Sequence, residues 1–281
     1  MLSRRTGYLE LSDHPVPDAT RQLQDHGYVL LPQVFDTDEV KELIEDVDRV
    51  FDEYEPDERV PDKEDGHWEP FRYEMLNRSG VVQRAVARRE ILDVIEPLLG
   101  EDCHVIANTA WRQPPGGSTH GGLKWHIDSG PHVPRPADVP WDERIPYPIF
   151  AIASHLMLQD CPIESGPTGV IPRSHTSGQH PPFEQMDDPE LEWNGTNVVP
   201  LTASAGDVLL FASDIWHRRL PPTDDDPGRY FVQCHYGRRD IAQRLRPTAE
   251  SNQLSPEAIE RAESRRDRSV IGLHKPFFYD G

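Results

Sequence analysis

The sequence predicts a mainly β protein, an antiparallel sandwich or barrel with flanking helices. Between residues 104 and 236, short β-rich runs are separated by Gly/Pro turns. Helical periodicity is confined to the segments before and after this region, and no internal repeat or linker divides the chain. A chain of 281 residues is long enough to bury a sizeable core. We therefore expect one domain over residues 1–281, with a helical part at about 1–100, a β core at about 101–240, and a C-terminal helix and tail at about 241–281.

The helical part begins with an amphipathic pattern. Apolar residues recur at helical spacing over residues 36–54, where Asp36 and Glu39 form the pattern of a capping box. A second helix is expected over residues 81–99, where Gly100 ends the pattern.

Three further segments complete this reading. Tyr28–Leu31 is expected to form a short strand ended by Pro32, and residues 55–69 have mixed charges without periodicity, as in a loop or flap. Residues 255–268 predict a charged helix, and an apolar-aromatic tail follows it.

The β-rich runs are the basis of the fold class. They are bounded by turn residues and are rich in β-branched and aromatic residues, and their spacing is typical of an antiparallel sandwich or barrel. They lie at residues 104–112, 122–128, 149–159, 168–171, 197–201, 207–211 and 229–236.

Composition excludes several classes of partner. The net charge of −20 argues against nucleic acid and against an anionic membrane surface. No apolar run approaches the roughly 18 residues of a membrane span, and no apolar region follows the N-terminal arginines as in a signal peptide. The three cysteines form no C-x-x-C pair, which disfavours a disulfide framework or zinc knuckle. We expect a reducing, cytoplasmic setting.

A candidate metal site begins at His126-Ile127-Asp128. Random placement alone gives on the order of one H-x-D tripeptide in a chain with 13 His. If residues 122–128 form a strand, however, His126 and Asp128 point to the same face. His217 follows the strand predicted at 207–211 and supplies a third ligand. Two histidines and one carboxylate form the facial triad of non-haem Fe(II) oxygenases.

Arg229 begins the next predicted strand, twelve residues after His217. A guanidinium in a partly buried pocket can bind the far carboxylate of a dicarboxylate cosubstrate through two hydrogen bonds. Each of these residues also has an ordinary explanation. A histidine in such a loop is usually a surface residue, and an arginine that opens a strand usually pairs with a neighbouring acid.

Taken in order, these motifs resemble the phytanoyl-CoA dioxygenase family of Fe(II)/2-oxoglutarate oxygenases. The resemblance covers roughly residues 98–239, and the separation of 89 residues between Asp128 and His217 suits it. The motifs are RQPPGG at 112–117, KWHID at 124–128, ESGPTGVIPRSH at 164–175, AGDVLLFASDIWH at 205–217 and GRYFVQCHYG at 228–237.

The resemblance implies a double-stranded β-helix, or jelly roll, as in cupins. It implies catalytic iron ligation by His126, Asp128 and His217, and a contact between Arg229 and the 2-oxoglutarate C5 carboxylate. Thr168 and Thr109 are weaker candidates for contacts with the cosubstrate.

The implied reaction uses Fe(II), 2-oxoglutarate and O2. It oxidises, most simply hydroxylates, a C–H bond of a small organic substrate and releases succinate. Because halogenases of this fold lack the carboxylate ligand, Asp128 implies an oxidation without halogenation. Arg219 departs from the family, which often has a small polar residue at that position, and this puts the mode of cosubstrate binding in question.

Two alternatives stay open at the level of sequence. One is a cupin-like metal enzyme that uses no cosubstrate, although such proteins usually carry H-x-H motifs, which this chain lacks. The other is a non-catalytic jelly-roll binding protein. Formation of succinate would distinguish the oxygenase from the first alternative. The second alternative predicts that replacing His126 or His217 with alanine changes stability only.

Overall fold

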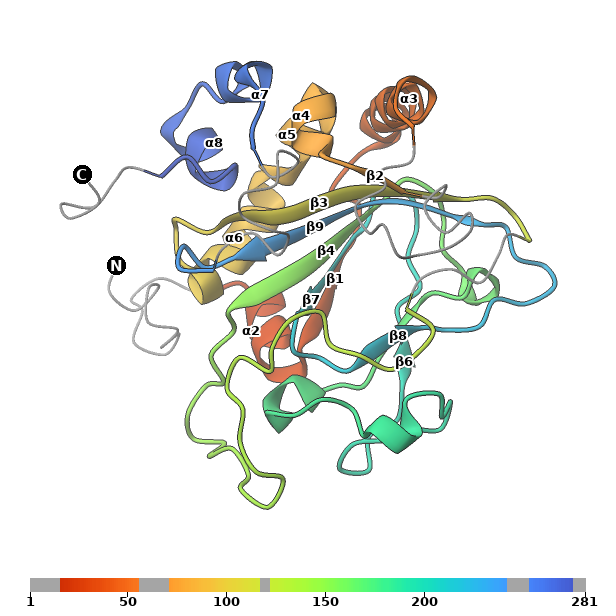
Figure 1. The fold of residues 1–281 in the computed structure, drawn as a ribbon, viewed down its shortest axis with the longest axis vertical. Helices are drawn as coiled ribbons and strands as arrows, with labels where there is room; N and C mark the ends of the chain where they lie inside the picture. The colour runs from red at the N-terminus through yellow and green to blue at the C-terminus, as the bar shows by residue number, and fades with distance from the viewer. Residues whose placement is uncertain (1–15, 56–70, 117–121, 242–252, 275–281) are drawn as a thin grey trace.

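The chain folds into two antiparallel sheets, seen in a computed structural model that describes residues 16–55, 71–116, 122–241 and 253–274 (Figure 1). The strands are β1 (Tyr28–Leu31), β2 (Phe71–Tyr73), β3 (His104–Gln113), β4 (Ala151–Met157), β5 (Thr168–Val170), β6 (Val199–Pro200), β7 (Val208–Ala212), β8 (His217–Arg219) and β9 (Arg229–Gly237). Within the described residues, the larger sheet has the order β1-β7-β4-β9-β3-β2 and the smaller sheet the order β6-β5-β8. The predicted fold class, mainly β with flanking helices, is confirmed.

Helices cover one face of the larger sheet, and the smaller sheet lies on the other side (Figure 1). The helices are α2 (Asp18–His26), α3 (Thr37–Glu53), α4 (Met75–Arg78), α5 (Gly80–Val86), α6 (Arg89–Leu99), α7 (Pro256–Arg261) and α8 (Arg265–Val270). None of the described helices is long and apolar enough to span a bilayer.

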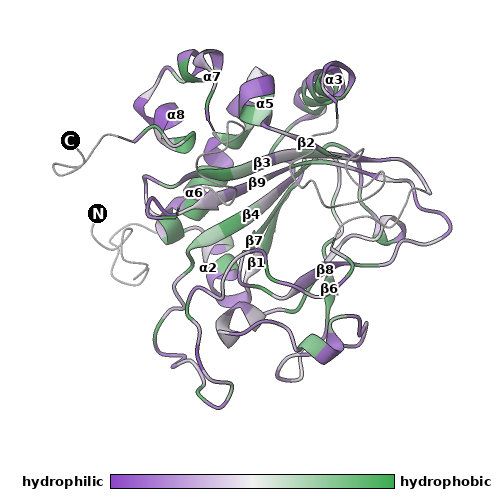
Figure 2. Cartoon of the chain, in the orientation of Figure 1, coloured by the Kyte–Doolittle hydropathy of each residue, from purple (hydrophilic) through white to green (hydrophobic). Residues whose placement is uncertain are grey.

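The two faces of the larger sheet have different roles because side chains alternate along a strand. On β4 and β9, Ile152, Leu156, Val232 and Tyr236 face the helices and join the main apolar core. The apolar colour of Figure 2 follows these strands and the inner sides of the helices. The opposite face carries polar side chains among a smaller apolar cluster that includes Phe231, and this face holds the candidate site.

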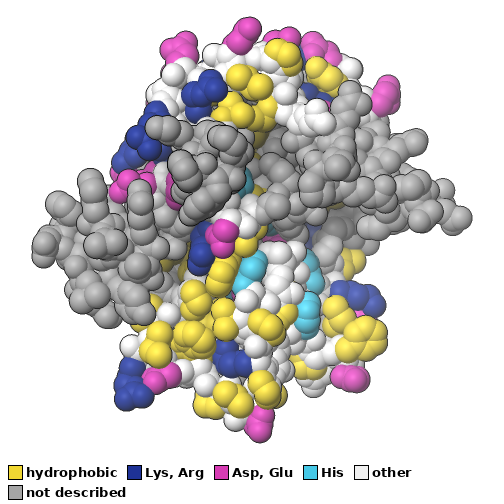
Figure 3. Space-filling view, turned by 60° about the vertical axis from the view of Figure 1, so that its left-hand side comes forward, with side chains coloured by type: hydrophobic (Ala, Val, Ile, Leu, Met, Phe, Trp, Pro, Cys, Tyr) yellow, Lys and Arg dark blue, Asp and Glu magenta, His cyan; other side chains and the backbone are white. Residues whose placement is uncertain are grey.

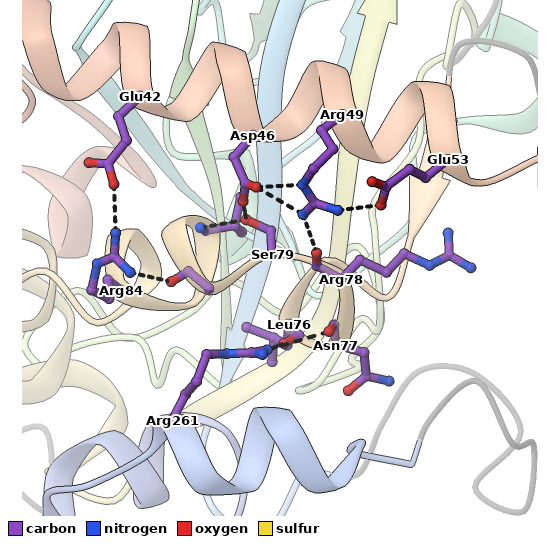
Figure 4. A network of polar contacts seen from close by, with 12 residues as sticks. Glu42, Asp46, Arg49, Glu53, Leu76, Asn77, Arg78, Ser79, Arg84 and Arg261 are labelled. Atoms are coloured by element: carbon purple, nitrogen blue, oxygen red, sulfur yellow. Dashed lines mark hydrogen bonds and ion pairs between the residues drawn. The ribbon is translucent and has the colours of Figure 1, made fainter.

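Polar contacts tie the helical layer together (Figure 4). Arg49 on α3 donates to the carbonyl of Arg78 at 2.7 Å, and Arg261 on α7 donates to the carbonyl of Leu76 at 2.6 Å. Ser79 donates to Asp46 and caps α5. These contacts hold α3, α4, α5 and α7 against one another above β3.

Several predicted elements are confirmed. The strand Tyr28–Leu31 is present, and the helix predicted at 36–54 forms with both hydrogen bonds of the Asp36–Glu39 capping box. Six of the seven predicted β-rich runs contain a strand.

The helix predicted at 81–99 is wrong as a single helix. It divides into α5 and α6 because Arg89 and Glu90 interrupt the apolar stripe, and the chain turns at Arg88, whose backbone is not helical. The helix predicted at 255–268 also divides, because Ser264 caps a new helix with Asp267.

The strand predicted at 122–128 is wrong. Only His126 forms a bridge, to His217, because its neighbours bond elsewhere: the Trp125 amide donates to Met186, and the Asp128 amide donates to Ser213. Strands β2 and β8 and helices α2 and α4 were not predicted. The predicted loop beyond Glu55 and the tail beyond His274 lie outside the described residues.

Candidate functional site

The structure brings His126, Asp128 and His217 together. One ligand atom from each residue lies within 4.8 Å of the other two, and His217 Nε2 is 3.6 Å from Asp128 Oδ1. Two atoms bound to one ion by bonds of about 2.1 Å are separated by roughly 3 to 4 Å, so this distance suits two ligands of a shared metal.

Backbone pairing fixes this convergence. His126 and His217 exchange two backbone hydrogen bonds of 2.9 and 3.0 Å, and the Asp128 amide donates to the carbonyl of Ser213 at 3.0 Å. The irregular segment that contains the H-x-D motif is thus held against the start of β8. A single β-bridge between His126 and His217 thus brings the motif to the site, where a full strand was expected.

Both histidines present the nitrogen that the site requires. The Nδ1 atom of His126 lies 2.7 Å from the carbonyl of Lys124, and that of His217 lies 2.9 Å from the carbonyl of Ile215. A carbonyl only accepts, so each Nδ1 carries the proton, and in the neutral ring Nε2 is the nitrogen that can bind a metal. Such backbone partners orient metal-binding histidines in many proteins.

Arg229 lines the same cavity as the three candidate ligands. It is 5% exposed, and its Nη2 donates to Thr168 Oγ1 at 3.4 Å. Its Nε has no hydrogen-bond partner among the described residues. Burial lowers the pKa of Arg229, while the nearby Cys161 sulfur opposes this shift. A buried guanidinium with an unused donor is suited to an incoming anion.

Arg219 is a second buried cation beside Arg229. Arg219 on β8 lies opposite Thr168 on β5 in the antiparallel register of the smaller sheet. Burial, followed by the charge of Arg229, lowers its pKa to about 10. The departure from the family pattern therefore places a second guanidinium beside Arg229 in the cavity lining.

Thr109 lies at the cavity wall but has a partner of its own. Its hydroxyl accepts a hydrogen bond of 3.1 Å from Trp111 Nε1, and Trp111 also lines the cavity. Trp125 and Trp216 pack with Ile171 in a separate cluster.

The polar residues of the cavity that were not predicted include His155, Gln233 and His235. His155 lies on β4, paired with Gln233 on β9, and burial followed by the charge of Arg229 lowers its pKa well below the usual value. His235 Nδ1 lies 3.7 Å from Asp128 Oδ2. The sequence did carry a signal for Gln233 and His235. Because side chains alternate along a strand, Arg229, Gln233 and His235 share one face of β9.

The cavity that contains these residues has a volume of about 450 Å³. Its apolar walls include Phe71, Ile106 and Leu254. This volume falls within the range of roughly 300–1,000 Å³ of small-molecule sites. On the face shown in Figure 3, histidine side chains gather near the middle of the molecule.

Comparisons with known proteins agree with this geometry. The family model of phytanoyl-CoA dioxygenase (PhyH) matches residues 23–221, and no protein of curated function matches the chain. Among solved structures, the non-heme alpha ketoglutarate dependent epimerase SnoN from nogalamycin biosynthesis is 19% identical, with a TM-score of 0.61 over 85% of this chain and 89% of its own. EctD from S. alaskensis, solved with 2-oxoglutarate and 5-hydroxyectoine, is 21% identical, with a TM-score of 0.62 over 90% of this chain and 87% of its own. At these identities the structural likeness supports the jelly-roll fold alone.

Proposed function

Because the chain belongs to the phytanoyl-CoA dioxygenase family of non-haem iron oxygenases, we propose that it hydroxylates a C–H bond of a small organic substrate. Decarboxylation of 2-oxoglutarate to succinate accompanies the reaction. The observation that supports this most strongly is the position of the His126, Asp128 and His217 donors in the same cavity as the Arg229 guanidinium.

The residues present fit an iron ion. Two imidazole nitrogens and one carboxylate oxygen are a ligand set that leaves coordination positions open for the cosubstrate and oxygen. His217 is 5% exposed, so a metal bound there is shielded from bulk water. His126 and Asp128 are partly buried in the same cavity wall. We assign His126, Asp128 and His217 as the iron ligands.

The residues also fit 2-oxoglutarate. Arg229 would hold its C5 carboxylate through charge-assisted hydrogen bonds, with the Thr168 hydroxyl beside the same guanidinium. Thr109 is a weaker contact because its hydroxyl already accepts from Trp111. Arg219 adds positive charge at this end and favours a dianionic cosubstrate.

Bound Fe(II) and 2-oxoglutarate together supply the oxidising power for C–H cleavage, with O2 as the oxidant. The protein orients the ligands through the backbone contacts of His126 and His217, anchors the keto acid at Arg229, and shields the reacting centre with Phe211 and Phe231. The Asp128 carboxylate fills the position that a halide would need, which favours hydroxylation over halogenation.

Two solved structures of similar fold support a small-molecule substrate. EctD was solved with 5-hydroxyectoine, and SnoN was solved with Fe3+, alpha ketoglutarate and nogalamycin RO. A small organic molecule suits a cavity of about 450 Å³, and the net charge of −20 disfavours nucleic acid.

The test is an anaerobic titration with Fe(II) and 2-oxoglutarate, followed by absorption. We expect a charge-transfer band in the wild type and in His180→Ala, which replaces an exposed histidine. We expect no band in His217→Ala. With oxygen, the wild type should form succinate. A band that survives in His217→Ala, or that is absent from the wild type, contradicts the assignment.

A further inference from the structure

His235 lies next to Asp128 and has no part in the proposed ligand set. Its Nδ1 is 3.7 Å from Asp128 Oδ2, whereas Asp128 Oδ1 faces His217 Nε2 at 3.6 Å. The two carboxylate oxygens therefore face different partners. One faces the proposed iron position, and the other faces β9.

The fold provides a slot for this imidazole. On β9, His235 pairs with Ala107 on one side and with Ala153 on the other. These small residues leave room for a ring between β3 and β4, and His235 is 3% exposed. The ring is therefore confined, and its nitrogens are directed by the strand.

The hydrogen-bond chemistry of the slot selects one tautomer. A carboxylate oxygen only accepts, so the nitrogen that faces Asp128 must carry the proton. In a neutral ring the other nitrogen, Nε2, is then an acceptor, and the Gln233 amide nitrogen lies 3.1 Å from it as a donor. Gln233, His235 and Asp128 thus line up as a directed chain, with a hydrogen bond between Gln233 and His235 and a longer separation of 3.7 Å between His235 and Asp128.

We propose that His235 is a positioning residue that holds Asp128 Oδ2, so that Asp128 binds iron through Oδ1 alone. This inference rests on the proposed iron site. The separation of 3.7 Å is longer than a hydrogen bond, and the carboxylate can turn toward the imidazole about χ2, which has a broad minimum. Single-oxygen ligation leaves one more coordination position open for the cosubstrate or for oxygen.

Two amide substitutions separate this role from simple packing. In His235→Asn, the side-chain nitrogen can occupy the place of Nδ1 and donate to Asp128. In His235→Gln, the amide reaches the place of Nε2 and leaves the Nδ1 position without a donor. Both variants keep a polar group in the slot, so their comparison isolates the donor.

The measurement is the affinity of the full-length, metal-free protein for Co(II), determined by competition with a chromogenic chelator. The ligand-field absorption of bound Co(II) is recorded in parallel. Loss of such an outer partner typically weakens metal binding 10–100-fold. We expect this loss, with an altered Co(II) spectrum, in His235→Gln, and near wild-type affinity in His235→Asn. Gln233→Leu keeps His235 but removes the donor to Nε2, so we expect a smaller loss.

The outcomes are distinguishable from those of the proposed function. Equal affinities in the Asn and Gln variants overturn the positioning role. Complete loss of binding in His235→Gln, as expected for His217→Ala, also overturns it, because His235 would then be a ligand. If either variant fails to fold, an unchanged affinity in Gln233→Leu overturns the directed chain. A wild type that binds no Co(II) contradicts the iron site itself.

Discussion

Replacing Arg229 with methionine should have opposite effects on cosubstrate binding and on the stability of the metal-free protein. The side chain is 5% exposed. It contacts Thr168 through one long hydrogen bond of 3.4 Å and has an unpartnered Nε among the described residues. Burial lowers its pKa, and Cys161 and Asp226 oppose this shift, so keeping the guanidinium charged in this cavity costs free energy.

The magnitude follows from these contacts. A hydrogen bond to a charged group contributes about 1.5–3 kcal/mol, so the loss of the guanidinium should raise the Kd for 2-oxoglutarate roughly 10–100-fold. In the metal-free protein, methionine fills a similar volume without a buried charge. Such replacements are often neutral or stabilising, and we expect a gain of about 1 kcal/mol.

Urea unfolding, with and without Fe(II) and 2-oxoglutarate under anaerobic conditions, measures both effects. At a cosubstrate concentration of 100 times the wild-type Kd, the wild type should gain about 2.7 kcal/mol. A variant with a Kd about 100-fold higher should gain only about 0.4 kcal/mol at that concentration. Arg144→Met is the matched control, because Arg144 is 87% exposed and lies outside the cavity.

Two results would refute this reasoning. If Arg229→Met destabilises the metal-free protein by more than about 2 kcal/mol, the arginine is a structural residue whose charge is already compensated. If the 2-oxoglutarate affinity is unchanged, the C5 carboxylate binds elsewhere, and Arg219 becomes the candidate.

Three further predictions concern stability. Gly166→Ala should destabilise by at least about 2 kcal/mol, because the backbone has a φ of +62° and an added Cβ would meet a carbonyl oxygen at 2.3 Å. Gly195→Ala, with a similar φ and open space, should cost only about 1 kcal/mol, as urea unfolding can check. Burial lowers the pKa of His175 to about 4, so the unfolded chain binds more protons between pH 6.5 and 4, and stability falls as the pH is lowered through this window. His175→Gln should reduce the slope of the unfolding free energy against pH by up to about 1.4 kcal/mol per pH unit. An unchanged slope would contradict a buried, neutral imidazole at this position. Ser79→Ala removes the cap of α5 and should lower the free energy of unfolding by about 1 kcal/mol, whereas Glu42→Ala breaks an exposed ion pair and should change it by less than about 0.5 kcal/mol. Equal effects of the last two substitutions would contradict this ranking.

The sequence was sufficient where the physical cause is local. The capping box at Asp36 and Glu39 needs only three residues of separation, and it formed as predicted. Strand β1 and the long strands β4 and β9 were predicted because their apolar runs end at turn residues. The break between α5 and α6 was also visible in principle, since Arg89 and Glu90 interrupt the stripe.

The sequence by itself therefore determined the β-rich core, the flanking helices and the residue types that iron and 2-oxoglutarate require, because periodicity and ligand chemistry are written in the order of side chains. Only the tertiary structure decided that one bridge between His126 and His217, and no strand, joins the two halves of the candidate iron site. It also decided that His235 reaches Asp128. These contacts depend on which backbone groups, far apart in the sequence, form hydrogen bonds with each other. The sequence of either segment alone does not predict that pairing.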